Sequence, residues 1–252
     1  MAVVEIEKPR DGVAVIRLNR PEVRNALNTE IRVLLAEAVE TLNQDDDIGA
    51  IVLTGGDTVF AVGADLNEQA GRDVVGAIRA YTHQAFWYSG KPVIAAVNGD
   101  AFGGGNEFIL QCDFVIASQN ARFAQTEVTI GLVPGGGATQ RLPRVIGRQN
   151  ALYALLTGTP MTAADAYRLG YVSEVVEGNA IDRAVELAAL IASRPRLAVR
   201  QIKEVVRLGL DTSFEAGIAL ERRGYQLMFG TRDLREGFAA VREGREPKFT
   251  GE

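Results

Sequence analysis

Short apolar runs and longer segments with helical spacing alternate through the first half of the chain. Strands are predicted over 13–19, 49–55, 91–99 and 113–118, with 2–7 as the hairpin partner of the first and a further strand end and loop over 59–66. Helices are predicted between them over 29–43 and 73–88, and from the glycines at 103–105 to about Cys112. This order favours parallel strands, because a helical crossover brings each strand back beside the previous one. The chain is therefore expected to adopt an α/β fold.

The second half of the chain has a different pattern. After Gly131 the strand signal is reduced to residues 170–176, and residues 179–242 have almost continuous helical character. Pro195 is suited to the start of a helix, and Thr212 with Glu215 predicts a capping box at a later helix start. We therefore expect two domains, a core over residues 1–195 and a helical region over residues 196–252.

Two residue counts restrict the chemistry. Cys112 and His83 are the only cysteine and the only histidine among 252 residues. An internal disulfide and a Cys/His metal cluster are excluded, and a Ser–His or Cys–His nucleophile would need His83, which we expect at a surface or subunit contact. No metal is therefore expected, and acid–base chemistry is left to carboxyl groups. The absence of a secretory leader and of an apolar run long enough for a membrane predicts a cytoplasmic protein without a membrane partner.

The charge pattern argues against a nucleic-acid partner. The formal net charge is −5, whereas nucleic-acid-binding domains are usually basic. Arg196, Arg200, Lys203 and Arg207 do share one helical face. We interpret them as a solvated or inter-subunit stripe rather than as a site for RNA or for coenzyme A phosphates.

The stretch "DAFGGGNEF" at 100–108 combines three consecutive glycines with Glu107. Glycine lets the backbone approach a ligand closely, and a helix N-terminus offers free N–H groups and partial positive charge. The stretch lacks both the Lys-Ser/Thr ending of a nucleotide P-loop and the GxGxxG order. An oxyanion hole for a developing carbonyl charge is thus favoured over a phosphate loop. A tight strand-to-helix turn without a ligand is the structural alternative.

Two further stretches add to this pattern. "FAVGADL" at 60–66 is a loop leading into a short helix, and its backbone offers a second N–H group. "ARFAQTEVTIGLVPGGGATQRLPR" at 121–144 carries Glu127 and a second glycine cluster. Together with "NRPEVRNALN" at 19–28, these ordered motifs resemble the crotonase superfamily, the enoyl-CoA hydratase/isomerase family, over nearly the whole chain.

The resemblance implies a fold, an assembly and a site. The fold would be a spiral of ββα units with a C-terminal helical trimerisation region, assembled as a homotrimer or homohexamer, and the substrate would be an acyl-CoA thioester. The N–H groups of Ala64 and Gly104 would hold the thioester oxygen, and Glu107 and Glu127 would match the two catalytic glutamates. The coenzyme A groove would be lined by the residues that match the family's two binding loops, namely Arg24, Ala26, Val62, Gly63, Asp65 and Leu66.

The chemistry of the residues agrees with a hydratase. Adding water to a 2-enoyl thioester requires a stabilised enolate oxygen, an activated water and a proton delivered to Cα, and two backbone donors with two carboxyl groups supply all three. No cofactor is needed beyond the coenzyme A of the substrate. Glu107 lies in the first turn of a helix, where the dipole favours its ionised form, so it is the candidate for activating water. Glu127 shows no comparable helix start and is the candidate proton donor.

Two alternative functions remain open, and three residues differ from those that are common in the family. An isomerase of the same fold often keeps only one of the two glutamates, and a non-catalytic relative would bind acyl-CoA or RNA. Asn106 stands where many hydratases carry a small residue or cysteine, Asn67 where lysine is common and Ala138 where glycine is common. None of the three removes a catalytic group, but Asn106 is expected to affect water placement or substrate choice.

Overall fold

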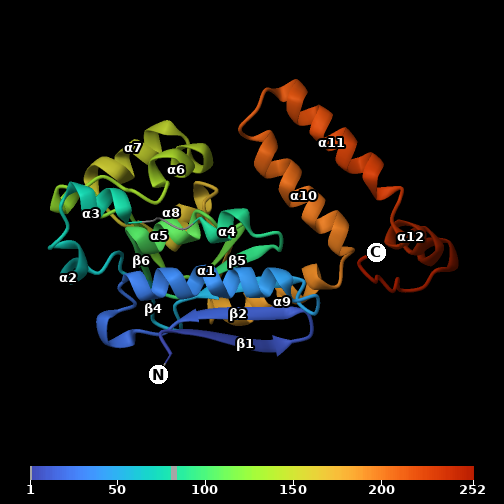
Figure 1. Cartoon of the computed structure of the whole chain (residues 1–252), viewed down its shortest axis with the longest axis horizontal. Coiled ribbons are helices and arrows are strands. Elements are labelled where there is room, and N and C mark those ends of the chain that lie inside the picture. Colours follow the sequence, from blue (N-terminus) through green and yellow to red (C-terminus); the bar gives the residue numbers. More distant parts are fainter. Residues whose placement is uncertain (1, 81–83) are drawn as a thin grey trace.

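The computed structural model describes residues 2–80 and 84–252, and these build two sheets with helices packed around them (Figure 1). The larger sheet has the order β1-β2-β3-β5-β7-β10. β1 is antiparallel to β2, and the other neighbouring strands are parallel. Its strands are β1 (Val4–Arg10), β2 (Val13–Leu18), β3 (Ala50–Thr54), β5 (Val93–Val97), β7 (Phe114–Ser118) and β10 (Glu174–Val176). The parallel arrangement predicted from the alternating pattern is confirmed.

The smaller sheet lies beside the first and has the order β4-β6-β8-β9. Each of β3, β5 and β7 is followed in the chain by a strand of this sheet, so successive turns of the chain form a spiral. The smaller strands are β4 (Val59–Ala61), β6 (Asp100–Phe102), β8 (Arg122–Ala124) and β9 (Met161–Thr162). Sequence periodicity missed β6, β8 and β9, because runs of two or three residues are too short to show an alternation.

Each face of the larger sheet is buried under a helix. Along β2, Val13 and Val15 pack toward one side and Ala14 and Ile16 toward the other, as the two-residue repeat of a strand requires. α1 (Thr29–Gln44) adds its apolar side to the Ala14 face, and α9 (Ala180–Ala192) covers the Val13 face. Both sides of the inner strands β3 and β5 are thereby removed from water, which is why their sequences are almost continuously apolar.

Short helices connect the strands of the spiral. They are α2 (Leu66–Gln69), α3 (Val74–Arg79), α4 (Ala85–Tyr88), α5 (Gly104–Ile109), α6 (Ala138–Ile146), α7 (Arg148–Thr157) and α8 (Ala163–Arg168). Residues 73–88, predicted as one helix, contain α3 and α4, and His83 lies outside the described residues. The helix at the triple glycine begins at Gly104 and ends at Ile109, before the predicted end near Cys112.

The C-terminal helices extend away from the sheets (Figure 1). α10 (Arg196–Gly209) and α11 (Phe214–Met228) pack on each other, and α12 (Arg232–Glu243) follows. Pro195 precedes α10 as predicted, but the predicted Thr212–Glu215 capping box is wrong. Ser213 caps α11 by accepting from the Ala216 N–H at 3.3 Å, while the Thr212 hydroxyl bonds to the Gly209 carbonyl. Within the described residues, no helix is both long and apolar enough to cross a membrane.

Candidate active site

The two backbone donors predicted from the glycine-rich loops lie at one cavity. This cavity has a volume of about 770 Å³, and Ala64, Gly104, Glu107 and Glu127 all line it. Gly104 is the first residue of α5, so its N–H has no acceptor inside the helix. A Cβ placed on Gly104 would lie 3.8 Å from the Ala64 nitrogen, so the two N–H groups are neighbours. Their loops come from successive turns of the spiral, after β4 and β6.

The position of the Ala64 N–H follows from its pairing with Leu27. The Leu27 N–H donates to Gly63 at 2.8 Å, and the Leu27 carbonyl accepts from Asp65 at 3.1 Å. These two bonds bracket Ala64 in a parallel bridge. In such a bridge the intervening N–H points away from the partner strand, which directs the Ala64 N–H away from Leu27.

Glu107 is almost fully buried on α5, with an exposed fraction of 7 %. Its Oε1 accepts from the Gly136 N–H at 2.6 Å and from the Ala138 N–H at 3.1 Å. Burial raises the pKa of Glu107, while these two N–H groups and the charges of Arg32 and Arg141 oppose the rise. The carboxylate is thus held by donors suited to its ionised form.

The second glycine cluster therefore binds Glu107, a role that the sequence alone did not indicate. Gly137 has a φ of 110°, in the region open to glycine, and it brings the N–H groups on either side of it to one carboxyl oxygen. Ala138, which departs from the family pattern, still contributes through its backbone. Its side chain is not needed for this contact.

Glu127 lies at the cavity beside the first residue of the triple glycine. A Cβ on Gly103 would lie 3.3 Å from Glu127 Oε1, so the carboxyl group lies against the loop that leads into α5. Burial, followed by the Glu107 charge, raises the pKa of Glu127 to about 7, although a hydrogen bond from its own N–H opposes the rise. The expectation that no helix starts at Glu127 is wrong, because it opens the short 3-10 helix η2 (Glu127–Ile130).

Two arginines that the sequence analysis did not single out face Glu107. Arg32 on α1 lines the cavity and lies over the Phe108 ring at 5.8 Å. Arg141 on α6 donates to the Gly136 carbonyl at 3.0 Å and lies 4.6 Å from the centre of the Trp87 ring. By holding Gly136, Arg141 supports the loop whose N–H groups bind Glu107. Helical spacing places both residues on their helices but does not indicate the charge that they face.

The residues predicted for the coenzyme A groove divide into two groups. Val62, Gly63 and Leu66 line the cavity together with Ala64. Arg24, Ala26 and Asp65 lie in the adjoining loops, where they contact Asp100 and Arg20. In these loops the Arg24 carbonyl accepts from Val62 at 3.3 Å, which keeps the two predicted segments side by side.

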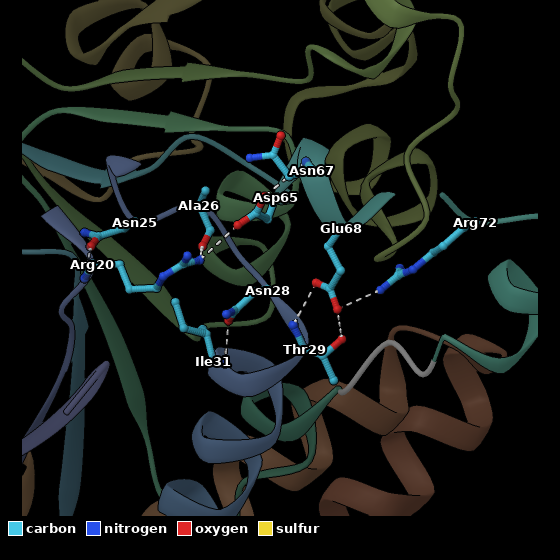
Figure 2. A network of polar contacts seen from close by, with 10 residues as sticks. All are labelled: Arg20, Asn25, Ala26, Asn28, Thr29, Ile31, Asp65, Asn67, Glu68 and Arg72. Atoms are coloured by element: carbon cyan, nitrogen blue, oxygen red, sulfur yellow. Dashed lines mark hydrogen bonds and ion pairs between the residues drawn. The ribbon is translucent and has the colours of Figure 1, made fainter. Parts of the chain in front are cut away.

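A polar network holds the loop between β2 and α1 against the start of α2 (Figure 2). Arg20 donates to the Ala26 carbonyl at 2.7 Å and pairs with Asp65 at 3.2 Å. Asp65 also caps α2 by accepting from the Asn67 N–H at 3.1 Å. Asn67 thus participates through its backbone, and Asp65 supports the groove walls structurally.

The same loop has left-handed backbone at two positions other than glycine. Arg24 and Asn25 have φ values of 53° and 56°. The buried Asn25 side chain stabilises this turn by accepting from Arg20 N–H and donating to the carbonyls of Gly55 and Phe60. The Arg24 guanidinium is left to pair with Asp100 at 2.6 Å.

The basic stripe of α10 has protein partners at three of its positions. Arg196 donates to the Asp46 carbonyl. Lys203 donates to the Asp113 carboxylate and to the Lys91 carbonyl, each at 2.8 Å. Arg207 lies over the Tyr88 ring at 5.4 Å. These contacts lie within one subunit, whereas the sequence predicted a solvated or inter-subunit stripe. That the stripe binds neither RNA nor coenzyme A phosphates stays a prediction.

Comparison with known proteins agrees with this geometry. The family model described as enoyl-CoA hydratase/isomerase matches residues 8–252. A probable enoyl-CoA hydratase of Rhizobium meliloti is 42 % identical over 94 % of both chains, and the 2,3-dehydroadipyl-CoA hydratase of Escherichia coli is 39 % identical over 95 % of both. The crystal structure of enoyl-CoA hydratase from Bacillus anthracis superposes with a TM-score of 0.95 at 34 % identity, over the full length of both chains. The chain therefore belongs to the enoyl-CoA hydratase/isomerase family.

Proposed function

We propose that the protein is a hydro-lyase that adds water across the 2,3 double bond of a 2-enoyl-CoA thioester and forms a 3-hydroxyacyl-CoA. The observation that carries this proposal is the arrangement of Glu107 and Glu127 at one cavity with the N–H groups of Ala64 and Gly104. The relatives named as hydratases support the same reaction. Two carboxyl groups on one cavity match the two proton-handling steps of hydration.

The two N–H groups are proposed to stabilise the oxygen on which charge develops. When water attacks C3 of the substrate, electron density moves through the double bond onto the thioester oxygen and forms an enolate. Preorganised N–H donors at this oxygen lower the barrier, with a contribution of about 10²–10³ in rate for each donor. The Gly104 N–H adds the partial positive charge of the α5 N-terminus.

The two carboxyl groups are proposed to have different proton states. Burial raises the pKa of Glu107, but its two backbone N–H donors and the two facing arginines oppose the rise and stabilise its carboxylate, so Glu107 is the proposed base that activates water. Glu127 has a pKa raised to about 7 and is the proposed acid that protonates Cα. The charge on Glu107 helps to keep the proton on Glu127, so the two groups titrate as a coupled pair. No metal or redox cofactor enters this proposed reaction.

The experiment that tests the reaction offers 2-enoyl and 3-enoyl thioesters of coenzyme A separately to the unmodified protein. We expect loss of the conjugated absorbance of the 2-enoyl substrate as water is added. Movement of the double bond in the 3-enoyl substrate, without hydration of any 2-enoyl substrate in a chain-length series, would replace the hydratase by the isomerase. Binding without turnover of either would favour the non-catalytic alternative.

The assembly is proposed to be a homotrimer or a pair of homotrimers. Large apolar side chains are exposed on the C-terminal helices, at Ile202, Phe214, Ile218, Tyr225 and Val241. Contacts between subunits would remove this surface from water. Light scattering is expected to report three or six times the chain mass of 27.1 kDa at micromolar concentration, and a monomer would contradict the proposal.

A cytoplasmic location and the lack of a nucleic-acid partner are also proposed. The first is based on the single cysteine and the second on the net charge of −5.

A further inference from the structure

Behind Glu127 the structure contains a line of three buried polar side chains that the proposed reaction does not use directly. Tyr171, Asn106 and Gln125 have exposed fractions of 5 %, 0 % and 1 %. They come from the turn after α8, from α5 and from the end of β8, and the chain separates Tyr171 from Asn106 by 65 residues. Buried polar groups are costly unless they are bonded, so their partners determine their orientation.

The hydrogen bonds along this line run in one direction. The Tyr171 hydroxyl donates to Asn106 Oδ1. This contact turns Asn106 Nδ2 toward the Gln125 amide. The Gln125 amide is assigned from the hydrogen-bond network with Oε1 toward Asn106, because the opposite assignment would place two amide nitrogens, both donors, against each other. In the assigned orientation Gln125 Oε1 accepts from Asn106 Nδ2 at 3.1 Å. The Gln125 amide then presents Nε2 to both carboxyl oxygens of Glu127, at 3.1 and 3.2 Å. This orientation of the Gln125 amide gives each donor in the line an acceptor.

The direction is determined at the Tyr171 end. Its hydroxyl makes no other hydrogen bond with a described residue, and its ring packs edge-on against Phe123 with the ring centres 5.2 Å apart. A hydroxyl that donates to Asn106 requires the oxygen of the Asn106 amide to face it. The amide nitrogen must then face Gln125, which in turn fixes the orientation of the Gln125 amide.

We propose that Tyr171, acting through Asn106 and Gln125, determines the side on which Glu127 carries its proton, which makes Tyr171 and Asn106 positioning residues for hydration. This inference rests on the proposed function, in which Glu127 is the acid. Because Gln125 presents N–H groups, Glu127 cannot donate its proton to Gln125 and must direct it into the cavity. If the line were reversed, the Gln125 carbonyl would accept that proton and hold it away from the substrate.

Reversing the amides of Asn106 and Gln125 would also change whether the surroundings favour the charged or the protonated form of Glu127. N–H donors favour the carboxylate that forms after proton transfer, whereas a facing carbonyl favours the protonated acid. Glu107 is the charged group that faces Glu127 from α5, and Arg32 and Arg141 face Glu107. Those groups stay in place when Tyr171 is altered. A change in the titration of Glu127 therefore reports on the line itself.

The test compares Tyr171→Phe with Tyr167→Phe, which removes the same hydroxyl from an exposed tyrosine on α8. Glutamate carboxyl groups are labelled with ¹³C and titrated by NMR, and Glu127→Gln identifies the Glu127 resonance. In Tyr171→Phe we expect the pKa of Glu127 to rise by about one unit, since one donated bond is lost, and kcat to fall about 10-fold. In Tyr167→Phe both values should match the unmodified protein.

A double-variant cycle distinguishes a relay from a local packing effect. Gln125→Leu should raise the pKa of Glu127 by at least as much as Tyr171→Phe, and the double variant should rise no further than Gln125→Leu alone. An unchanged pKa in Tyr171→Phe overturns the inference even if the rate falls, and so does additivity in the double variant. If Tyr171→Phe does not fold, Asn106→Ser should give the same shift, and its absence is equally decisive.

The titration needs no substrate. If the unmodified protein hydrates no 2-enoyl thioester, the proposed function fails, while the NMR result still reports whether Tyr171 acts on Glu127.

Discussion

A methyl group added at Gly105 would act directly on the spacing of the proposed oxyanion donors. Gly105 follows the donor residue Gly104 on α5 and packs against Ala61 on β4, three residues before the second donor, Ala64. A Cβ on Gly105 would lie 2.5 Å from the Ala61 oxygen, 2.8 Å from its Cβ and 3.0 Å from its carbonyl carbon. Two of these atoms belong to the strand backbone, so no side-chain rotation relieves the contact.

The size of the effect follows from these distances. Ordinary van der Waals contact begins at 3.4 Å, so β4 and α5 must separate by about 0.9 Å at the closest pair. The separation moves the N–H groups of Gly104 and Ala64 apart, and a misplacement of about 1 Å costs roughly 10²-fold in rate. Overpacking of this kind costs about 1–3 kcal/mol of stability, which for a domain of this size lowers Tm by roughly 3–10 °C. Helix propensity acts in the opposite direction, because alanine is the better helix former by up to about 1 kcal/mol.

The assay follows kcat on a 2-enoyl thioester and Tm by circular dichroism for Gly105→Ala and for a matched variant, Gly71→Ala. A Cβ at Gly71 meets no atom within 4 Å, and its φ lies outside the left-handed region. We expect kcat of Gly105→Ala to fall about 10²-fold while Gly71→Ala stays within about threefold of the unmodified protein. The reasoning is refuted if folded Gly105→Ala retains full turnover, or if the protein is unfolded at 25 °C, which exceeds the predicted loss of stability.

Four further predictions follow from the two carboxyl groups and the backbone donor. Glu107→Gln and Glu127→Gln should each lower hydration by roughly 10²–10⁴-fold, and the double variant should fall by less than the product, which steady-state kinetics would measure. Because the pKa of Glu127 is raised to about 7 and the proposed acid must carry its proton, kcat/KM should decline above about pH 7, and in Glu107→Gln the pKa of Glu127 measured by NMR should move down. The raised pKa also means that the folded chain holds this proton more tightly than the unfolded chain does. The resulting stability is present at low pH and lost as the pH rises toward 7, so Tm of the unmodified protein should fall relative to Glu127→Gln over that range. Gly104→Pro removes the N–H at the proposed oxyanion hole and should lower kcat at least ~10²-fold, and unchanged turnover in a folded variant would contradict that role.

The order of local signals in the sequence is sufficient to predict much of this protein. The alternation of strands and helices predicts the parallel sheet, and Asn28 predicts the start of α1, whose cap is seen in its bond to the Ile31 N–H. The triple glycine and the acids after it predict which loops meet at the cavity. These features could be predicted because spacing, helix caps and glycine conformations are encoded within a few residues of one another.

Other elements were missed or misplaced where the local signal is weak. The strands of the smaller sheet are two or three residues long, and their hydrogen bonds come from strands distant in the chain. At α11, Thr212 and Ser213 are both good capping residues, and the observed structure uses Ser213. The local sequence does not distinguish between these adjacent hydroxyls. In the structure Thr212 bonds back to the Gly209 carbonyl, and Ser213 is left to cap the helix.

Only the tertiary structure decided how the two glutamates differ. The sequence places both acids near glycines, but the donors to Glu107 come from Gly136 and Ala138, about 30 residues further along the chain. The raised pKa of Glu127 comes from burial and from Glu107, and the line behind it ends at Tyr171. Sequence spacing reports which side chains share a helix face or a strand face. Burial, hydrogen-bond direction and the electrostatic effect of one acid on another exist only once distant segments are packed together, because desolvation and Coulomb energy depend on distances in space and not along the chain.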